Sequence, residues 1–428
     1  MVKLLIIADD FTGALDTGVK FAARGAKTRV VMDPAFDFNQ ADDQIQVLVM
    51  DAETRHLEPT AAYSIVYQAV TRALAAGVHC IYKKTDSALR GNIGAELTAM
   101  LNASNEDRLP FIPAFPKAGR ITRNGIHLVD GVPVAESVFG RDPFEPVRHS
   151  QVADILKEQS SVPCVYRIPG KPDKDLPGIQ VFDAASDEDL LKIGHQLGNG
   201  LRLCAGCAGF AAVLAELLSL TGCVPQVPPL HGSLFIACGS VNPVTRQQLD
   251  TAERAGFPRF QLLPEQKLSP PWLKSDACRA EVKRWLEVVN REGCCILDSN
   301  DPKESGDAAR KFAIQQGINL QQMRVIISNT LGQLIKQLLD FGLQATITCT
   351  GGDTLLALMR SVEVTELAPV CELSPGVVLT RFTYQSKTYD IISKSGGFGE
   401  PDLLCKLFKL VSGETAKKEG VLCSQNIT

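Results

Sequence analysis

The sequence lacks an excess of positive charge. Its 428 residues include 44 Lys and Arg against 48 Asp and Glu, which gives a formal net charge of −4. Binding along a nucleic-acid backbone requires a basic face that neutralises many phosphates. We therefore expect no nucleic-acid partner. A small anion needs only local positive charge and stays a candidate ligand.

Long apolar runs are also missing. No stretch approaches the ~20 apolar residues that span a bilayer, and the apolar run in MVKLLIIADD (1–10) is too short for the core of a secretory signal. The 13 cysteines are odd in number, and CAGC (204–207) has no second pair at zinc-site spacing. We therefore expect a cytoplasmic protein with buried thiols and no membrane contact.

Several motifs of common enzyme classes are absent. There is no GxxxxGK[ST], which excludes a P-loop enzyme, and no GxGxxG opens the first strand-to-helix turn, which disfavours an NAD(P)-dependent oxidoreductase. Neither GxSxG nor HExxH occurs. The six histidines are scattered without metal-ligand spacing, so we expect no protein metal cluster.

Short apolar runs alternate with longer helical patterns along most of the chain. Runs such as KLLIIA (3–8), QVLVMD (46–51) and ATITCT (345–350) predict strands, whereas segments 12–25 and 60–77 predict helices that end in glycine. This alternation is typical of a parallel sheet covered by helices. Residues 110–147, rich in Pro, Gly and Arg, interrupt it, and there we expect loops or a hairpin.

A segment near residue 225 divides the chain. TGCVPQVPPLHG (221–232) is rich in Pro and Gly and has no hydrophobic period, as is typical of a linker. We therefore predict an α/β protein with two domains, each a largely parallel sheet flanked by helices, and a ligand cleft between them. We expect the domains at 1–224 and 231–411, followed by a frayed tail at 412–428. The sequence leaves open whether the protein forms a homodimer.

Glycines gather where the strands of the C-terminal half end. In open α/β sheets, ligands bind beyond the carboxyl ends of the strands, and there the chain has Gly239-Ser240, Gly351-Gly352 and Gly396-Gly397. Glycine lets backbone N–H groups approach a ligand, and a helix N-terminus behind such a loop attracts an anion. We expect GGDT (351–354) to contact a triphosphate. A capped turn without a ligand is the alternative.

Charged and hydroxyl side chains follow the strands of the N-terminal half instead. Aspartates can accept hydrogen bonds from sugar hydroxyls, and arginines can bind a carboxylate with two parallel hydrogen bonds. Such loops suit a small polyhydroxy acid, and the two halves together suggest phosphoryl transfer. Alternatively, the aspartates only cap a helix and the arginines are solvated or paired within the protein. The residues are Asp9, Asp10, Arg55, Lys84, Thr85, Asp86, Ser87 and Arg90.

Six stretches at these loops resemble the four-carbon acid sugar kinase family, and they span nearly the whole chain in order. They are IADDFTGALDTGV (7–19), KKTDSALRGNIGAEL (83–97), PAFPKAGR (113–120), ACGSVNP (237–243), TGGDTLLAL (350–358) and KSGGFGEPDLL (394–404). The resemblance implies an ATP-dependent kinase that phosphorylates the terminal hydroxyl of a tetronic acid. It also implies an N-terminal domain that binds the acid and a C-terminal domain that binds ATP.

The resemblance also implies particular contacts in this chain. Acid contacts fall on Asp10, Arg55, Lys84, Thr85, Asp86 and Ser87, and nucleotide contacts fall on Ser240, Gly351, Ser395, Gly396, Gly397 and Phe398. Loop chemistry adds Arg90 to the first set and Gly352 to the second. Segments 8–18 and 134–147 most resemble D-threonate kinases, whereas D-erythronate and 3-oxo-tetronate kinases share most of the motifs.

The implied reaction needs a cation for the acid and a carboxylate for its hydroxyl. Arg55 or Lys84 would anchor the acid's carboxylate, and Mg²⁺ would bridge the ATP phosphates through water and few carboxylates. The group that positions or deprotonates the accepting hydroxyl is expected among Asp10, Asp86 and Asp353. 4-Hydroxythreonine is an alternative substrate. A non-catalytic sensor of sugar acid and nucleotide is an alternative of another class.

Overall fold

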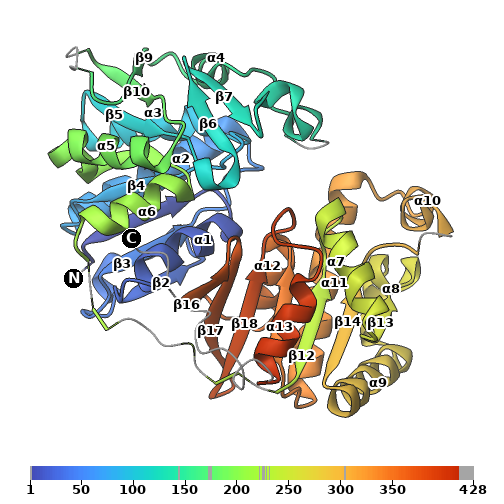
Figure 1. Ribbon diagram of the computed structural model, residues 1–428. Helices are drawn as coiled ribbons and strands as arrows, with labels where there is room; N and C mark the ends of the chain where they lie inside the picture. Colours follow the sequence, from blue (N-terminus) through green and yellow to red (C-terminus); the bar gives the residue numbers. More distant parts are fainter. Residues whose placement is uncertain are drawn as a thin grey trace. The chain divides into compact units, whose positions relative to one another are not determined.

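The computed structural model describes residues 2–142, 145–171, 176–220, 222–223, 227, 229–230, 232–302 and 305–413. The chain divides into two compact units, Met1–Pro225 and Gln226–Thr428, coloured blue to green and yellow to red in Figure 1. Half of the expected linker 221–232, and all of the expected tail except residues 412 and 413, lie outside the described residues.

The N-terminal unit is built on a parallel sheet with the strand order β2-β3-β1-β4-β11-β5-β10-β9. Four adjacent strands of this order, β3, β1, β4 and β11, are buried throughout, as expected for a sheet covered on both faces. The strands are β1 (Leu4–Ala8), β2 (Thr28–Val31), β3 (Val47–Asp51), β4 (Ile81–Lys84), β5 (Arg108–Ile112), β9 (Cys164–Arg167), β10 (Gly178–Phe182) and β11 (Leu203–Gly206).

Two sets of helices cover this sheet (Figure 1). In one set, α1 (Phe11–Ala22) contacts α6 (Ala208–Leu217), which contacts α5 (Asp187–Leu197). In the other, α3 (Ile93–Ser104) contacts α2 (Pro59–Ala75) and α4 (Val152–Lys157). Leu5 and Ile7 of β1 share a core with α2 and α3. Alternate β1 residues therefore face this second set.

A small antiparallel sheet occupies the segment in which the sequence predicted loops or a hairpin. Strands β6 (Arg120–Arg123), β7 (Ile126–Val129) and β8 (Val132–Pro133) pair in that order. Asn124 and Gly125 both have positive φ, as the tightest hairpin turn requires. The predicted hairpin is therefore confirmed.

The C-terminal unit has a mixed sheet with the order β13-β14-β12-β15-β18-β17-β16. The first five strands are parallel, and the last three pair antiparallel. The sequence predicted four of the five parallel strands, but neither the parallel strand at 259–261 nor the two antiparallel strands at 366–374 and 377–384. The strands are β12 (Leu234–Cys238), β13 (Arg259–Gln261), β14 (Cys294–Asp298), β15 (Thr346–Thr350), β16 (Glu366–Ser374), β17 (Val377–Tyr384) and β18 (Lys387–Lys394).

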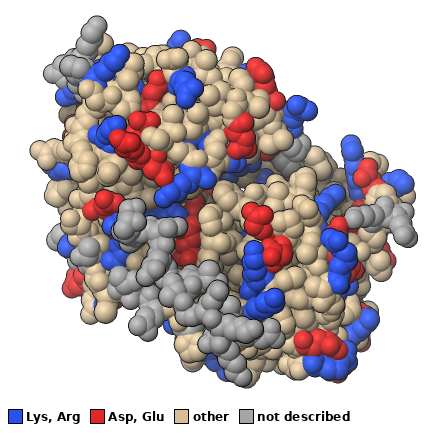
Figure 2. Space-filling model, viewed as in Figure 1, with Lys and Arg blue, Asp and Glu red and all other residues tan. Residues whose placement is uncertain are grey.

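Helices of the C-terminal unit also form two sets. Helix α11 (Leu320–Asp340) contacts α8 (Pro264–Leu268), α9 (Asp276–Glu292), α10 (Ala308–Gln315) and α12 (Gly352–Ser361). Helix α7 (Pro243–Arg254) contacts α13 (Leu403–Val411). None of the helices in the described part of the chain combines the length and apolarity needed to cross a bilayer. On the face shown in Figure 2, basic and acidic side chains are interspersed.

Candidate active site

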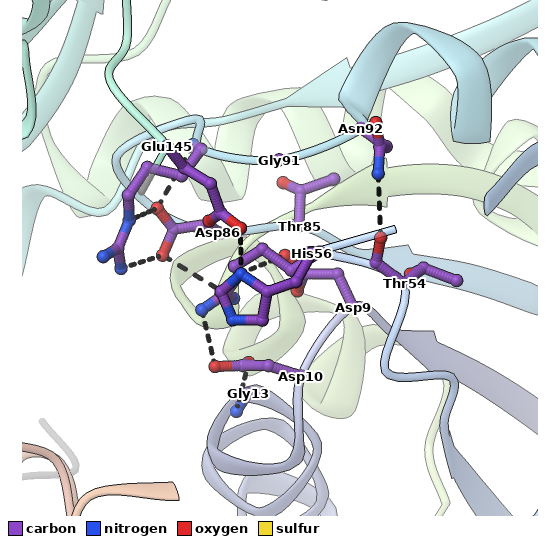
Figure 3. A network of polar contacts seen from close by, with 12 residues as sticks. Asp9, Asp10, Gly13, Thr54, His56, Thr85, Asp86, Gly91, Asn92 and Glu145 are labelled. Carbon is purple, nitrogen blue, oxygen red and sulfur yellow. Dashed lines mark hydrogen bonds and ion pairs between the residues drawn. The ribbon is translucent and has the colours of Figure 1, made fainter. Parts of the chain in front are cut away.

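The polar loops of the N-terminal unit follow three adjacent strands. Strands β3, β1 and β4 are neighbours and parallel, so their carboxyl ends lie along one edge of the sheet. Asp9 and Asp10 follow β1, Arg55 lies in the loop after β3, and Thr85 follows β4. The structure therefore brings together side chains that lie up to about eighty positions apart in the sequence (Figure 3).

Arg55 is the centre of this site and is bound by carboxylates. Its Nε lies 2.8 Å from Asp9 Oδ2, its Nη1 lies 2.6 Å from Asp10 Oδ2, and its Nη2 lies 3.8 Å from Asp86 Oδ1. Burial alone would raise the pKa of Asp9, but the positive charges of Arg55 and the neighbouring lysines lower that pKa below its ordinary value. Arg55 thus keeps the Asp9 carboxylate ionised.

Asp86 is held even more firmly. Arg90 donates to both of its carboxylate oxygens, from Nε at 2.8 Å and from Nη2 at 3.1 Å. The backbone N–H groups of Ala88 and Arg90 donate to Oδ2 as well. Burial opposes ionisation, but the Arg90 and Arg55 charges outweigh it and hold the pKa of Asp86 far below its ordinary value. Asp86 is therefore a weak base whose acceptor positions are already occupied.

Asp10 and Lys84 meet at the first turn of α1. Asp10 is the N-cap of α1, and its Oδ1 accepts from the Gly13 N–H at 2.9 Å. A Cβ placed on Gly13 would lie 2.6 Å from Asp10 Oδ1 and 2.8 Å from Lys84 Nζ, so both side chains pack over the bare glycine. Lys84 is buried and its Nζ donates to the Thr85 carbonyl at 2.9 Å. The site thus contains an ammonium group that lacks a carboxylate within 4.0 Å among the described residues.

Three buried side-chain oxygens in this site have no hydrogen-bond partner within the described part of the chain. They are Asp9 Oδ1, Asp51 Oδ2 and Thr85 Oγ1. Buried polar atoms in folded proteins nearly always have a partner. Unsatisfied atoms next to Arg55 and Lys84 are therefore consistent with a polar ligand that would bind there.

Several residues of this network were not predicted from the sequence. Asp51, the last residue of β3, is buried, and burial together with the nearby Glu53 and Asp10 charges raises its pKa well above the ordinary value. His56 contacts Glu145 through Nδ1 (Figure 3). The stretch DAETRH (51–56) carries Asp51 and His56 at and just beyond the end of a strand, which is the signal that could have found these two residues.

A buried histidine joins the antiparallel sheet to the loop after β4. His127 of β7 contacts the Ser87 carbonyl oxygen through Nε2 at 2.9 Å and Thr122 Oγ1 through Nδ1 at 3.1 Å. Burial lowers the pKa of His127 to about 4. Its neutral ring therefore donates from Nε2 to Ser87 and accepts from Thr122. The sheet that interrupts the parallel fold positions the expected acid-binding loop.

The glycine-rich loops of the C-terminal unit also follow adjacent strands. Ser240, Gly351 and Ser395 follow β12, β15 and β18, which are neighbours and parallel. Gly351 has a φ of +95° and is the N-cap of α12, a conformation that favours glycine. A Cβ on Gly396 would lie 2.5 Å from Ser240 Oγ. The three loops converge, as the sequence predicted from strand ends.

Asp353 lies in the first turn of α12 but is not a free acid. Arg324 of α11 donates to it from Nε at 2.6 Å and from Nη2 at 3.0 Å.

The Ser240 loop is held by other residues. Asn300 Nδ2 donates to the Ser240 carbonyl at 3.1 Å, and Asp298 Oδ1 accepts from the same amide at 2.8 Å. Asn300 and Asp298 were not anticipated from the sequence.

The CAGC cysteines take no part in either loop cluster. Cys204 and Cys207 are buried and form no disulfide. Burial raises the pKa of Cys207 to about 11, so its thiol stays protonated. Groups of three or more His, Cys, Asp or Glu that could hold a metal do not occur in the described ranges.

Known proteins share this two-domain architecture. A sugar-binding N-terminal domain matches residues 4–214, and a nucleotide-binding C-terminal domain matches residues 235–404. A D-threonate kinase from Salmonella typhimurium is 29% identical, over 94% of this chain and 97% of its own length. A D-erythronate kinase from Heliobacterium modesticaldum is 28% identical, over 98% of this chain and 100% of its own length.

The same architecture occurs in solved structures. The crystal structure of a Haemophilus influenzae protein matches with a TM-score of 0.71 at 22% identity, over 96% of this chain and 99% of that one. At this identity the likeness supports the fold alone. The two matched domains cover most of both units. The chain therefore belongs to the four-carbon acid sugar kinase family, in which a sugar-binding N-terminal domain precedes a nucleotide-binding C-terminal domain.

Proposed function

We propose that the protein transfers the γ-phosphoryl group of ATP to the terminal hydroxyl of a four-carbon sugar acid, with D-threonate as the first candidate. The observation that carries this proposal is the contrast between the two loop clusters. One places charged side chains around unsatisfied buried acceptors, and the other places glycines and a helix N-terminus at strand ends. D-Erythronate, 3-oxo-tetronate and 4-hydroxythreonine are the alternative substrates.

In the N-terminal unit, Lys84 is our choice for the cation that anchors the carboxylate of the acid. Arg55 already contacts Asp9 and Asp10 at hydrogen-bonding distance, so it would have to give up those partners to bind the acid. Lys84 Nζ has a backbone carbonyl as its recorded partner and lies beside the first turn of α1. A helix N-terminus adds to the attraction for an anion.

Asp10 is our choice for the group that accepts the proton of, or orients, the attacking hydroxyl. Asp86 already accepts from Arg90 at both oxygens, and Asp353 does so from Arg324. Asp10 has one recorded donor on each oxygen, and its side chain is 23% exposed. It therefore retains lone pairs for a substrate hydroxyl.

In the C-terminal unit, we assign the phosphates of ATP to the loops that contain Ser240, Gly351-Gly352 and 395–398. The N-terminus of α12 begins at Gly352, where free N–H groups favour negative charge. Mg²⁺ usually keeps several waters and binds through phosphates and one or two carboxylates. It therefore needs no group of three or more protein ligands, and none that could hold a metal occurs among the described residues. When bound, it would neutralise charge on the phosphates.

The test is a substrate panel assayed by ADP release. Purified protein with Mg-ATP is supplied in turn with D-threonate, D-erythronate, 3-oxo-tetronate and 4-hydroxythreonine. We expect ADP release that depends on the acid and is fastest with D-threonate. ADP release with only one other member of the panel would identify that acid, and not D-threonate, as the substrate. Binding of acid and nucleotide without ADP release would instead support a non-catalytic sensor.

A further inference from the structure

Two buried side chains of α7 hold the carbonyl oxygens of the turn that follows β18. Thr245 Oγ1 donates to the Gly396 carbonyl at 2.7 Å. Gln248 Nε2 lies within 3.1 Å of three consecutive carbonyl oxygens, those of Phe398, Gly399 and Glu400. Neither Thr245 nor Gln248 is exposed to solvent. The carbonyl side of the turn therefore faces the interior of the unit.

Lys394 lies beneath the same turn. It is the last residue of β18 and is 1% exposed. Its Nζ donates to the Ser395 carbonyl at 3.1 Å and to Thr245 Oγ1 at 3.3 Å, and it lies 3.5 Å from the Gly396 carbonyl. All these partners are neutral. Within the described residues, no carboxylate forms an ion pair with Lys394.

The N–H side of the turn faces the other way. No acceptor in the described part of the chain is recorded for the N–H groups of Gly396 and Gly397. The close approach of Gly396 to Ser240 Oγ places these donors beside the loop after β12. Consecutive backbone N–H groups above a buried cation form a concave surface that attracts an anion.

We infer that Lys394 is a positioning residue for the nucleotide phosphates. Its ammonium group holds the carbonyl oxygens of Ser395 and Gly396 inward. It thereby places a positive charge behind the outward N–H groups, without itself touching the ligand. The inference rests on the proposed function, because it takes the 395–398 turn to be part of the phosphate site.

The charge on Lys394 should then be coupled to nucleotide binding. Burial lowers the pKa of Lys394 to about 8 in the free protein. A bound polyphosphate favours the ammonium form, so above that pH the protein must take up a proton to bind. Lys394 is charged at low pH and loses its charge as the pH rises, so affinity is highest below pH 8 and falls above it.

Few other groups near Lys394 titrate in this range. Its partners across the sheet, Thr350 of β15 and Val377 of β17, carry no charge, and α7 contributes the neutral Thr245. Burial raises the pKa of Cys238, at the end of β12, to about 12. Asp298, beyond it on β14, is paired with Arg259 at 2.7 Å.

The test is calorimetric titration of the full-length protein with metal-free ADP across this pH range. We expect the ADP affinity of the wild type to fall about tenfold from about pH 7 to about pH 9. Lys394→Met should bind ADP more weakly at neutral pH and show no such fall. Lys394→Arg should also show none, because arginine stays charged throughout. Adenosine, which lacks phosphates, should bind the wild type independently of pH.

Lys387→Met is the matched control, because Lys387 is exposed at the start of the same strand and should keep the wild-type profile. A pH-independent ADP affinity in the wild type would overturn the role of Lys394 while leaving the proposed function intact. A tenfold fall of ADP affinity that persists in Lys394→Met would also overturn the role of Lys394. If the methionine variant does not fold, the same fall in Lys394→Arg would overturn it. Failure of the wild type to bind ADP at any pH would contradict the proposed function itself.

Discussion

At the residue scale, the expected acid site is dominated by charges that neutralise one another. Arg55 contacts Asp9, Asp10 and Asp86. Removing one partner of a buried ion pair typically costs about 3–5 kcal/mol. An Arg55→Ala variant would therefore lose stability and site geometry together. A kinetic change in that variant could not be assigned to acid binding alone. Lys84, and a conservative change at Asp10 that keeps an oxygen able to accept from Arg55, are more informative.

Asp10→Asn should lower kcat about 10²- to 10⁴-fold, the usual contribution of a general base. Asparagine caps a helix about as well as aspartate, so α1 should stay intact, but the amide cannot accept the hydroxyl proton. The measurement is the rate of ADP release at saturating acid and ATP. Asp16→Asn, which changes a carboxylate further along the same helix, is the control. A kcat within about twofold of the wild type would remove Asp10 from the mechanism.

His127 should make the N-terminal unit sensitive to acid. Its pKa is about 4 in the folded protein and about 6.5 when unfolded. The unfolded state therefore binds more protons between those values, and stability falls as pH drops through that window. The full effect is up to about 3 kcal/mol. Calorimetric unfolding of the wild type and His127→Gln should show a steeper loss in the wild type. Parallel pH profiles would contradict this role.

At the element scale, the loops after β12 and β18 support each other through close contact. The contact of Gly396 with Ser240 means that Gly396→Ala would force a Cβ to within 2.5 Å of Ser240 Oγ. We expect a loss of about 1–3 kcal/mol, as for other overpacked sites. Both tryptophans, Trp272 and Trp285, lie in the C-terminal unit. Urea unfolding followed by tryptophan fluorescence therefore reports on that unit.

The matched background for this test is Ser240→Ala, which removes the hydroxyl that the new methyl group would meet. Gly396→Ala should be clearly less destabilising there than in the wild type, since contacting residues give non-additive effects. Equal losses in the two backgrounds would show that the Gly396–Ser240 contact is not the cause.

Most parallel strands could be predicted from the sequence because they are short apolar runs separated by long helical patterns, as β1 and β15 are. The parallel strands β5, β9 and β13 were not predicted. The antiparallel strands β16 and β17 were missed. They are partly exposed and mix apolar with polar residues, so their local pattern resembles loop or helix. Strand ends also located both loop clusters, because parallel strands align their carboxyl ends wherever they occur in the chain.

The pairing of side chains within those clusters could not be predicted. Arg55 lies 46 residues from Asp9 and 45 from Asp10 in the sequence, and nothing local indicates that these carboxylates occupy its guanidinium group. The same holds for Arg324 and Asp353, which lie on different helices. Such contacts depend on how helices and loops pack in three dimensions.

At the scale of the whole molecule, each of the two units is expected to bind one ligand. The N-terminal unit is expected to bind the sugar acid through charged side chains, and the C-terminal unit is expected to bind phosphates through backbone N–H groups. This division agrees with the two domains that match the chain, one sugar-binding and one nucleotide-binding. The two ligands should therefore protect different segments of the backbone.

Hydrogen exchange of the full-length protein, measured by mass spectrometry with each ligand in turn, tests that division most directly. ADP should slow exchange in segments 351–354 and 395–398, and D-threonate should slow it in segments 9–13, 53–56 and 84–91. Protection of residues 9–91 by ADP, with segments 351–354 and 395–398 unchanged, would contradict the account.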